Sequence, residues 1–253
     1  MNPIYKFWLV LRGSLFWIVF LPSVLLFSIL LSISIFFPIG LRVAVVKQWI
    51  RINLGWVWLT CGLGYEIEGL ENIPEDGFII MSKHSSTWET IALQLWFRPM
   101  VWIVKRELFW IPFFGWGLKA MNAIGINRGT GRQAIKQLVS EGRKRMDEGR
   151  IVMIFPEGTR VMPGQYKPFK LGGAILAQKT GYSILPIAHN AGEFWPRHSW
   201  IKWPGKIKVV IGKPIDPADK KPDQIIGEVE SWILKTGERI SDKEQLRKLG
   251  IET

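Results

Sequence analysis

The stretch GFIIMSKHSSTWETIA, residues 77–92, decides the fold, because it joins a short apolar run directly to the start of a helix. GFIIMS is short, apolar and bounded by Gly and Lys, as a buried strand is. Residues 87–97 then favour a helix, and the same alternation of strand and helix recurs along the chain. Alternation of this kind indicates an α/β fold with a largely parallel sheet flanked by helices.

Seven segments match the strand pattern, being short, apolar and bounded by Gly, Pro or charge. They are YEIEGL (65–70), GFIIMS (77–82), VWIVK (101–105), AIGIN (123–127), IVMIFP (151–156), YSILPIA (182–188) and KIKVVIG (206–212). The segments predicted as helices are 87–97, 107–121, 131–148, 171–179 and 222–240.

An uncharged run of 29 residues lies between Arg12 and Arg42. As one helix it would be about 43 Å long, which is ample for a hydrocarbon core of about 30 Å. Positive charge on both flanks favours a hairpin that turns near residues 32–38 and keeps both ends cytoplasmic. A single tilted span is the alternative. We therefore expect residues 1–62 to be membrane-anchoring helices.

The net charge of +12 predicts a polyanionic partner, either nucleic acid or the anionic surface of a membrane. Fourteen Trp and fourteen Phe against four Tyr favour contact with lipid, so we expect a bilayer as the partner and no nucleic acid. Cys61 is the single cysteine, which excludes an intrachain disulfide and fits a reducing compartment.

The loop KHSSTWET, residues 83–90, places a histidine five residues before a glutamate. If the helix starts at Ser86, Glu89 lies in its first turn and can point back to His84. A carboxylate at one ring nitrogen raises the basicity of the other, as a general base requires. The same residues also form a capping box, with Ser86 as N-cap and Glu89 as N3. The sequence alone leaves these two interpretations even.

Cations follow several predicted strands, at the edge where open α/β sheets gather their sites. The loop FPEGTR, residues 155–160, ends in Arg160, whose planar fork suits phosphate. Lys105 and Arg128 occupy similar positions after two other strands. We therefore predict an anion pocket, with a structural salt bridge between Glu157 and Arg160 as the alternative.

Other candidate groups carry weaker signals. Ser85 and Ser86 could be the nucleophile of a lipid hydrolase, yet no G-x-S-x-G elbow surrounds them. A metal site would need more ligands around His189 and His198, so we predict no metal, a loop histidine at 189 and an interfacial one at 198. The aromatic segment LFWIPFFGWGL, residues 108–118, is either core packing or a wall facing an acyl chain or the bilayer.

Four blocks occur in one order along the chain, namely HSSTWE (84–89), INR (126–128), FPEGTR (155–160) and LPIAHNAG (185–192). In this order and spacing they resemble the motif blocks of the 1-acylglycerol-3-phosphate acyltransferases, the PlsC-like family. The resemblance implies transfer of a fatty acyl group from a thioester, on acyl carrier protein or coenzyme A, to the 2-hydroxyl of lysophosphatidic acid. Phosphatidic acid would be the product, made without a cofactor at the cytoplasmic face of the inner membrane during phospholipid biosynthesis.

The resemblance also implies residue roles and boundaries. His84 would be the general base and Glu89 its orienting carboxylate, although the family more usually has Asp at the latter position. The residues expected to bind or shape the substrate site are Lys105, Arg128, Glu157, Gly158, Thr159, Arg160 and Pro186. Residues 63–240 would form the acyltransferase domain and residues 241–253 a polar tail.

Three alternatives stay open at this point. The same chemistry could act on another lysolipid or on glycerol 3-phosphate, a hydrolase could use Ser85 or Ser86, and a non-enzymatic membrane protein could bind nucleic acid through its charge. Only the acyltransferase uses His84, the anion pocket and the hydrophobic anchor together.

Overall fold

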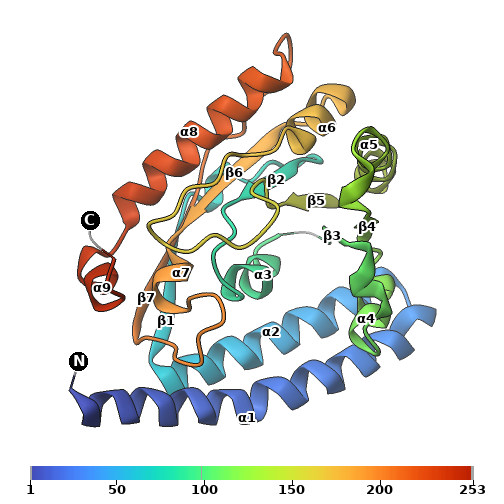
Figure 1. The fold of residues 1–253 in the computed structure, drawn as a ribbon. Helices are drawn as coiled ribbons and strands as arrows, with labels where there is room; N and C mark the ends of the chain where they lie inside the picture. The colour runs from blue at the N-terminus through green and yellow to red at the C-terminus, as the bar shows by residue number, and fades with distance from the viewer. Residues whose placement is uncertain (1, 98, 252–253) are drawn as a thin grey trace.

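Seven strands form one sheet in the order β1–β7–β6–β2–β5–β3–β4 in the computed structural model, which describes residues 2–97 and 99–251 (Figure 1). The side chain of Arg128 lies outside this description. The strands are β1 (Leu63–Glu68), β2 (Ile79–Ser82), β3 (Met100–Lys105), β4 (Ile124–Ile126), β5 (Ile151–Ile154), β6 (Ile184–His189) and β7 (Gly205–Ile211). All seven predicted strands are present.

The helices alternate with these strands as expected. They are α1 (Pro3–Ile33), α2 (Ile39–Cys61), α3 (Trp88–Ala92), α4 (Phe114–Ala120), α5 (Arg132–Asp147), α6 (Gly172–Thr180), α7 (Ala191–Phe194), α8 (Pro222–Ile240) and α9 (Lys243–Lys248). Short 3-10 helices are η1 (Ser34–Phe36), η2 (Leu70–Asn72), η3 (Leu93–Leu95), η4 (Arg106–Trp110) and η5 (Arg128–Thr130).

The sheet is largely parallel, which confirms the predicted α/β class. β2 pairs in parallel with β5 and β6, β3 pairs in parallel with β4 and β5, and β1 pairs in parallel with β7. Only β6 and β7 pair antiparallel among the described strands. Consequently the carboxyl ends of β2, β5, β6, β3 and β4 share one edge, where the loops that follow them meet.

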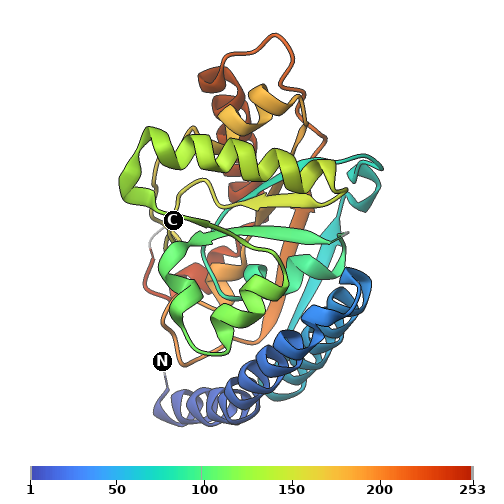
Figure 2. The same cartoon turned by 90° about the vertical axis from the view of Figure 1, so that its right-hand side faces the viewer.

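Each face of the sheet has its own apolar layer, because side chains alternate along a strand. Ile80 and Ile187 belong to the cluster that includes α1, α2 and α3, whereas Ile79 and Ile184 belong to the cluster with α5, α6 and α8. Figure 2 shows α1 and α2 as a separate layer on one side of the sheet. The strands are thus buried on both faces, which is why they appear in the sequence as continuous apolar runs.

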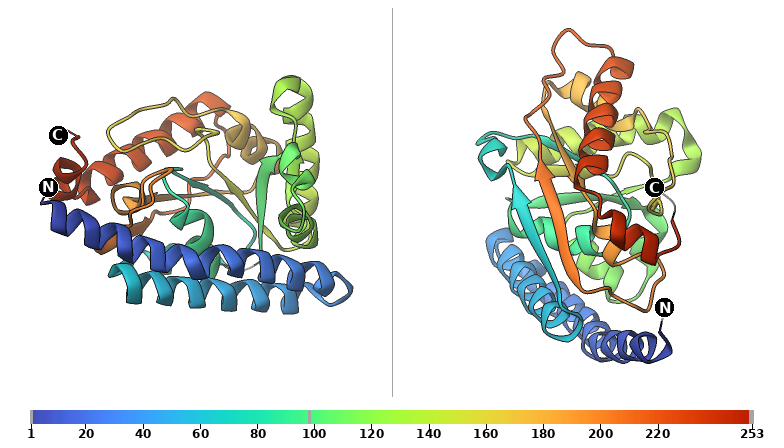
Figure 3. Two further views of the ribbon diagram at one scale, coloured as in Figure 1. Left: turned by 60° about the horizontal axis from the view of Figure 1, so that its bottom comes forward. Right: turned by 90° about the vertical axis from the view of Figure 1, so that its left-hand side faces the viewer.

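The N-terminal helices α1 and α2, called the anchor helices below, lie side by side as a hairpin (Figure 3). The turn between them lies at residues 34–38, within the predicted range. Among the described residues, 3–36 form the one helical segment long and apolar enough to cross a membrane, by length and composition. Val46, Ile50 and Leu54 of α2 are buried in the same cluster as Ile80 and Ile187, so the anchor helices share a core with the sheet.

Three predictions differ from the structure in detail. The single helix predicted for residues 107–121 is broken into η4 and α4, because Pro112 and Phe113 intervene and Phe113 has a φ of 60°. The C-terminal segment, expected as a polar tail, contains α9, and Leu246 is buried. In addition, the helix predicted for 87–97 is a short α3 continued by η3.

Candidate functional site

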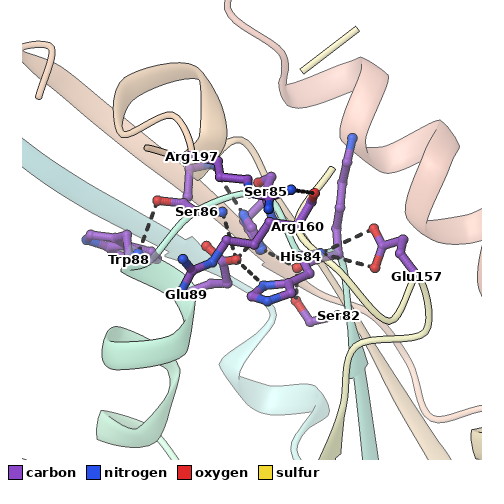
Figure 4. A network of polar contacts seen from close by, with 12 residues as sticks. Ser82, His84, Ser85, Ser86, Trp88, Glu89, Glu157, Arg160 and Arg197 are labelled. Carbon is purple, nitrogen blue, oxygen red and sulfur yellow. Dashed lines mark hydrogen bonds and ion pairs between the residues drawn. The ribbon is translucent and has the colours of Figure 1, made fainter. Parts of the chain in front are cut away.

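The polar site lies at the sheet edge where β2, β5 and β6 end. Because β2 pairs in parallel with both neighbours, the segments that follow these three strands converge. Figure 4 shows His84 and Glu89 from the segment after β2 beside Glu157 and Arg160 from the segment after β5. The fold therefore brings the HSSTWE and FPEGTR blocks together at one site.

His84 and Glu89 are in direct contact. The Nδ1 atom of His84 lies 2.9 Å from Oε1 of Glu89, and Glu89 is fully buried. The same carboxylate oxygen accepts the backbone N–H groups of Ser85 and Ser86, each at 2.9 Å. Three donors thus converge on one oxygen, so the orientation of the carboxylate is fixed from three directions.

These donors keep Glu89 ionised. Burial by itself raises the pKa of this carboxyl, whereas the hydrogen bonds from His84 and from the N–H of Ser86 lower it and favour the ionised form. An ionised carboxylate only accepts hydrogen bonds, so Nδ1 of His84 must carry the proton. The lone pair of the imidazole is then on Nε2, as a general base requires.

The residues at the start of α3 also cap the helix. Ser86 Oγ accepts the N–H of Trp88 at 3.1 Å, while Glu89 accepts the N–H of Ser86, although regular helix begins only at Trp88 with Thr87 as the N-cap. The helix start is therefore one residue later than predicted. Capping and the histidine contact use the same carboxylate, so the two interpretations of the sequence are compatible.

The ring of His84 is held by stacking. Phe155 lies parallel to it, with ring centroids 3.9 Å apart and planes 9° apart, and Trp102 stacks on the same phenylalanine. The side chain of His84 is nevertheless 16% exposed, whereas Glu89 is inaccessible. A substrate can consequently reach the imidazole but not its carboxylate partner. The stacking role of Phe155 had no signal in the sequence.

Glu157 contacts the backbone of the histidine loop. Both of its carboxylate oxygens lie 3.2 Å from the N–H of His84, and its side chain is buried. Burial, which outweighs the hydrogen bonds and the charge of Lys83, raises the pKa of Glu157 to about 7. No ion pair joins Glu157 to Arg160 among the described residues, so the predicted structural salt bridge is absent there.

Arg160 is a cation whose charge interacts with Glu89 of the His84–Glu89 pair. Its side chain is half-buried, and its Nε has no hydrogen-bond partner within the described part of the chain. Burial lowers the pKa of Arg160, while the charge of Glu89 opposes this shift. Arg197 donates from Nη1 to the carbonyl of Arg160 at 3.3 Å, which adds a second guanidinium that the sequence analysis did not identify.

The remaining predicted binding residues are distributed along the same edge. Lys105 ends β3 and is exposed, and η5 begins at Arg128 directly after β4, although the arginine side chain is outside the described residues. Gly158 has a φ of +71°, and a Cβ there would meet Nζ of Lys170 at 3.2 Å. Lys170 is therefore a further cation beside the FPEGTR turn. Thr159 lies partly buried in this turn.

Pro186 packs on the side of the sheet that α8 covers. It is buried within β6, opposite Met81, and its Cγ would meet a Cβ at Gly212 at 2.9 Å, next to the ring of Trp232 from α8. The fourth block thus reaches the site through another residue, His189.

His189 was wrongly expected to lie in a loop. It ends β6, is 2% exposed, and carries Nε2 at 2.8 Å from the carbonyl of Lys83. Its Nδ1 accepts the N–H of Ala191 at 3.3 Å, so Nε2 must be the protonated atom of a neutral ring. Burial lowers the pKa of His189, in agreement with this assignment. The strand register could have predicted the position, because Ser82 lies opposite Ile187 and both histidines come two residues later.

The two serines are poorly placed as nucleophiles. Ser86 Oγ donates to the carbonyl of Trp195 at 2.7 Å and is inaccessible. Ser85 is 3% exposed and faces Gly192, where a Cβ would lie 2.9 Å from its Oγ. This packing disfavours the hydrolase. Residues able to hold a metal ion do not gather in groups of three or more His, Cys, Asp or Glu within the described ranges.

A sequence model of the family described as Acyltransferase matches residues 64–190. The chain is 44% identical over 205 residues to the 1-acyl-sn-glycerol-3-phosphate acyltransferase of Pseudomonas aeruginosa, covering 79% of each chain. It is 33% identical over 160 residues to the enzyme of that name from Bacillus subtilis, covering 62% of this chain and 76% of the relative. The crystal structure of the LPA acyltransferase PlsC from Thermotoga maritima superposes with a TM-score of 0.75 at 22% identity, over 95% of this chain and 98% of the other, which supports the fold.

Proposed function

We propose, from the premise that this chain belongs to the 1-acyl-sn-glycerol-3-phosphate acyltransferase family, that it transfers a fatty acyl group to the 2-hydroxyl of lysophosphatidic acid and forms phosphatidic acid. One observation carries the proposal. The contact of 2.9 Å between His84 and the buried Glu89 orients an accessible imidazole as a base. A hydroxyl acceptor needs such a base, because it is a weak nucleophile until its proton is removed.

The reaction proceeds by direct attack. The acceptor hydroxyl donates a hydrogen bond to Nε2 of His84, which takes the proton as the oxygen attacks the thioester carbonyl. The negative charge of Glu89 stabilises the imidazolium that forms. Collapse of the tetrahedral intermediate breaks the carbon–sulfur bond, and the imidazolium returns its proton to the departing thiolate. This route uses no covalent acyl-enzyme, which agrees with the packed environment of Ser85 and Ser86.

The phosphate of the acceptor binds to the cations at the same edge. Arg160 is suited to this role because its Nε has no hydrogen-bond partner among the described residues and a guanidinium can bind phosphate with two parallel hydrogen bonds. Lys105 and Arg128 remain predicted contributors, and Lys170 joins them beside Gly158. For Glu157 the contact with His84 supports a positioning role in the binding loop, since a carboxylate would repel the phosphate.

The anchor helices hold the enzyme on the membrane. A helix of 31 residues such as α1 could cross a bilayer, but α1 also packs on the body, against Trp200 at residues 13–17 and against α4 nearer its C-terminal end. Many of its outward side chains are large and apolar, including Ile4, Phe7, Trp8, Leu15, Ile18 and Leu26. We therefore favour a hairpin lying in one leaflet, on the cytoplasmic face of the inner membrane, where both acyl carrier protein and coenzyme A are present.

The aromatic segment 108–118 extends this lipid-facing surface. Trp110 is 75% exposed and Trp116 is 48% exposed, so core packing does not account for them. The segment adjoins α1, because a Cβ at Gly117 would meet Ser28 and Leu31 at 3.8 Å. These exposed rings fit the hydrocarbon of a bilayer or the acyl chains of a substrate.

A crossed assay tests this function. Purified protein in phospholipid vesicles is given acyl-coenzyme A or the acyl thioester of acyl carrier protein as donor. Lysophosphatidic acid, glycerol 3-phosphate or a zwitterionic lysolipid is the acceptor. We expect phosphatidic acid from lysophosphatidic acid and at least tenfold lower kcat/KM for the other acceptors. Faster acylation of another acceptor would reassign the substrate, and release of free fatty acid without acyl transfer would support the hydrolase. Because the donors are compared in parallel, the same assay identifies the thioester.

A further inference from the structure

Lys202 is a fully buried lysine that the reaction does not use. It is 0% exposed and lies between α7 and β7, in the segment that faces α1. Its Nζ donates to the carbonyls of Trp200 at 2.9 Å and Ser199 at 3.3 Å. Among the described residues no carboxylate lies within 4 Å of Nζ, and burial lowers the pKa of Lys202 to about 7, so hydrogen bonds and ring faces are the groups that stabilise its charged form.

An aromatic cage surrounds the ammonium group. Nζ lies 3.8 Å from the ring centroid of Trp17, 5.0 Å from that of Trp195 and 5.2 Å from that of Phe16. Phe16 and Trp17 belong to α1, whereas Trp195 follows α7. Ring faces attract a cation, and the attraction is stronger when water is excluded. Lys202 thus binds an anchor helix and the catalytic body at the same point.

The backbone is shaped for this contact. Trp17 Nε1 donates to the carbonyl of Trp200 at 3.3 Å, so one oxygen accepts from both α1 and Lys202. A Cβ at Gly13 of α1 would lie 2.6 Å from the same oxygen, closer than side-chain carbons approach. Glycine at position 13 is therefore what lets α1 sit against the 195–203 segment.

The cage is connected to the catalytic pair by an unbroken series of contacts. The carbonyl of Trp195, whose ring is part of the cage, accepts the hydroxyl of Ser86 at 2.7 Å. The N–H of Ser86 in turn donates to Oε1 of Glu89 at 2.9 Å, and that oxygen contacts Nδ1 of His84. Displacement of Trp195 would therefore move the donor that fixes Glu89.

We infer that Lys202 is a positioning residue through which the seating of α1 on the body holds the His84–Glu89 pair in its working geometry. The expected loss of acyl-transfer activity rests on the proposed function, but the expected loss of structural support for the loop 83–90 does not. With α1 unseated, the Trp195 carbonyl releases Ser86, and the loop 83–90 loses part of its support. The enzyme is then fully active only when its anchor helix is docked.

The test removes the ammonium group of Lys202 and keeps an aliphatic side chain in its place. Lys202→Met retains a side chain of similar length without donors or charge, and Lys208→Met makes the same change at an exposed lysine of β7. Both are reconstituted in phospholipid vesicles and compared with wild type by acyl-transfer kinetics and by amide hydrogen exchange. For Lys202→Met we expect kcat to fall at least fivefold with acceptor KM changed less than twofold. Exchange over residues 83–92 should rise at least tenfold while that of β2 and β5 is unchanged, and Lys208→Met should match wild type in both measurements.

Two outcomes would overturn the inference. Unchanged exchange over residues 83–92 would show that Lys202 does not position the His84–Glu89 pair. An equal rise in exchange across all strands would show that Lys202 stabilises the whole fold and has no specific positioning role. If Lys202→Met does not fold, Gly13→Ala displaces α1 from the other side and should give the same localised exchange pattern, whose absence would be equally decisive. Exchange is independent of catalysis, so a wild-type protein without acyltransferase activity would refute the proposed function while the exchange result still decides the positioning role.

Discussion

The segment 84–89, just after β2, and the segment 189–193, which begins at the last residue of β6, each pair a histidine with a glutamate and use the pair differently. His84 is followed by Glu89, and His189 is followed by Glu193 one residue closer. In the first segment the glutamate reaches Nδ1 of its histidine at 2.9 Å. In the second, Glu193 turns away and accepts from Ser241 Oγ at 2.7 Å and the N–H of Asp242 at 2.8 Å.

The histidines of the two segments also differ in their accessibility to solvent. The side chain of His84 is 16% exposed, whereas His189 is 2% exposed and has both ring nitrogens engaged by backbone groups. The first histidine can therefore exchange a proton with a substrate, and the second supports the loop that carries the first. Spacing between a histidine and a glutamate thus does not identify a catalytic pair unless the ring keeps one nitrogen accessible.

The largest effect is expected from removal of the accessible ring. His84→Ala should lower kcat/KM for lysophosphatidic acid by about 1000-fold, because a positioned general base contributes roughly 100-fold to 10,000-fold. The measurement is steady-state acyl transfer in vesicles, with circular dichroism to verify folding. A folded variant that keeps more than a tenth of wild-type activity would remove His84 from the role of base.

A second prediction compares the same substitution in the two segments. Glu89→Gln keeps an oxygen that can accept from the backbone but removes the charge that stabilises the imidazolium, so kcat should fall roughly 100-fold. Glu193→Gln, the matched control, should change kcat less than twofold, since Glu193 does not contact a histidine ring. Similar losses in both variants would show that the glutamates act only through folding.

The third prediction concerns pH and Glu157, which fixes the backbone of the first segment. Its folded pKa of about 7 lies above the unfolded value of about 4.3, so between these limits the folded state holds a proton that the unfolded state has released. The free energy of unfolding should therefore fall as pH rises from about 4.5 to about 7, by roughly 3 kcal/mol at most from this group. Glu157→Gln should remove that part of the slope.

Chemical denaturation of both proteins across pH 4.5–8 measures this difference directly. Other titrating groups cancel when the glutamine variant is subtracted from wild type. Parallel curves would mean that Glu157 titrates in the folded protein as it does in the unfolded chain, and its burial would then have no consequence for protonation.

The smallest effect should come from the second segment. Glu193→Gln replaces charge-assisted hydrogen bonds to Ser241 and Asp242 with weaker ones, which costs roughly 1–2 kcal/mol locally. Amide exchange over residues 241–251 should rise roughly 5-fold to 30-fold, with little change over residues 83–92. A larger rise in amide exchange near His84 than near α9 would contradict the prediction that Glu193 supports α9 and not the His84 loop.

Local patterns in the sequence were sufficient for most of the fold. The seven strands were predictable because each is buried on both faces and bounded by turn residues, and Pro222–Ile240 was predicted with its exact limits because Pro starts the helix and a strong apolar stripe continues it. Pro112 signalled the break before α4, which the prediction of one helix over 107–121 overlooked, whereas the positive φ of Phe113 had no signal in the sequence. Short helices such as α7 and α9 gave no periodic signal.

Contacts between distant segments explain what the sequence analysis missed at the site. The structure brings His84, Glu89 and Glu157 together, as the motif blocks predicted, while their roles in the reaction stay predictions. Arg197 and Lys202 lie in the segment between β6 and β7, which folds back to reach both the site and α1. The sequence does not show whether a lysine is buried or exposed, so the burial of Lys202 could not be predicted from it. Whether the other predicted binding residues contact substrate stays a prediction.

The core shared by α2 and the sheet limits how this protein can be divided or recombined. Removing residues 1–62 would uncover Ile80, Leu185 and Ile187, which α1 and α2 now cover, and would leave an aggregation-prone sheet in place of a soluble enzyme. For the same reason the hairpin could not be exchanged for an unrelated targeting sequence, as a modular anchor could. In a lineage of such enzymes, the anchor and the catalytic body must therefore change together.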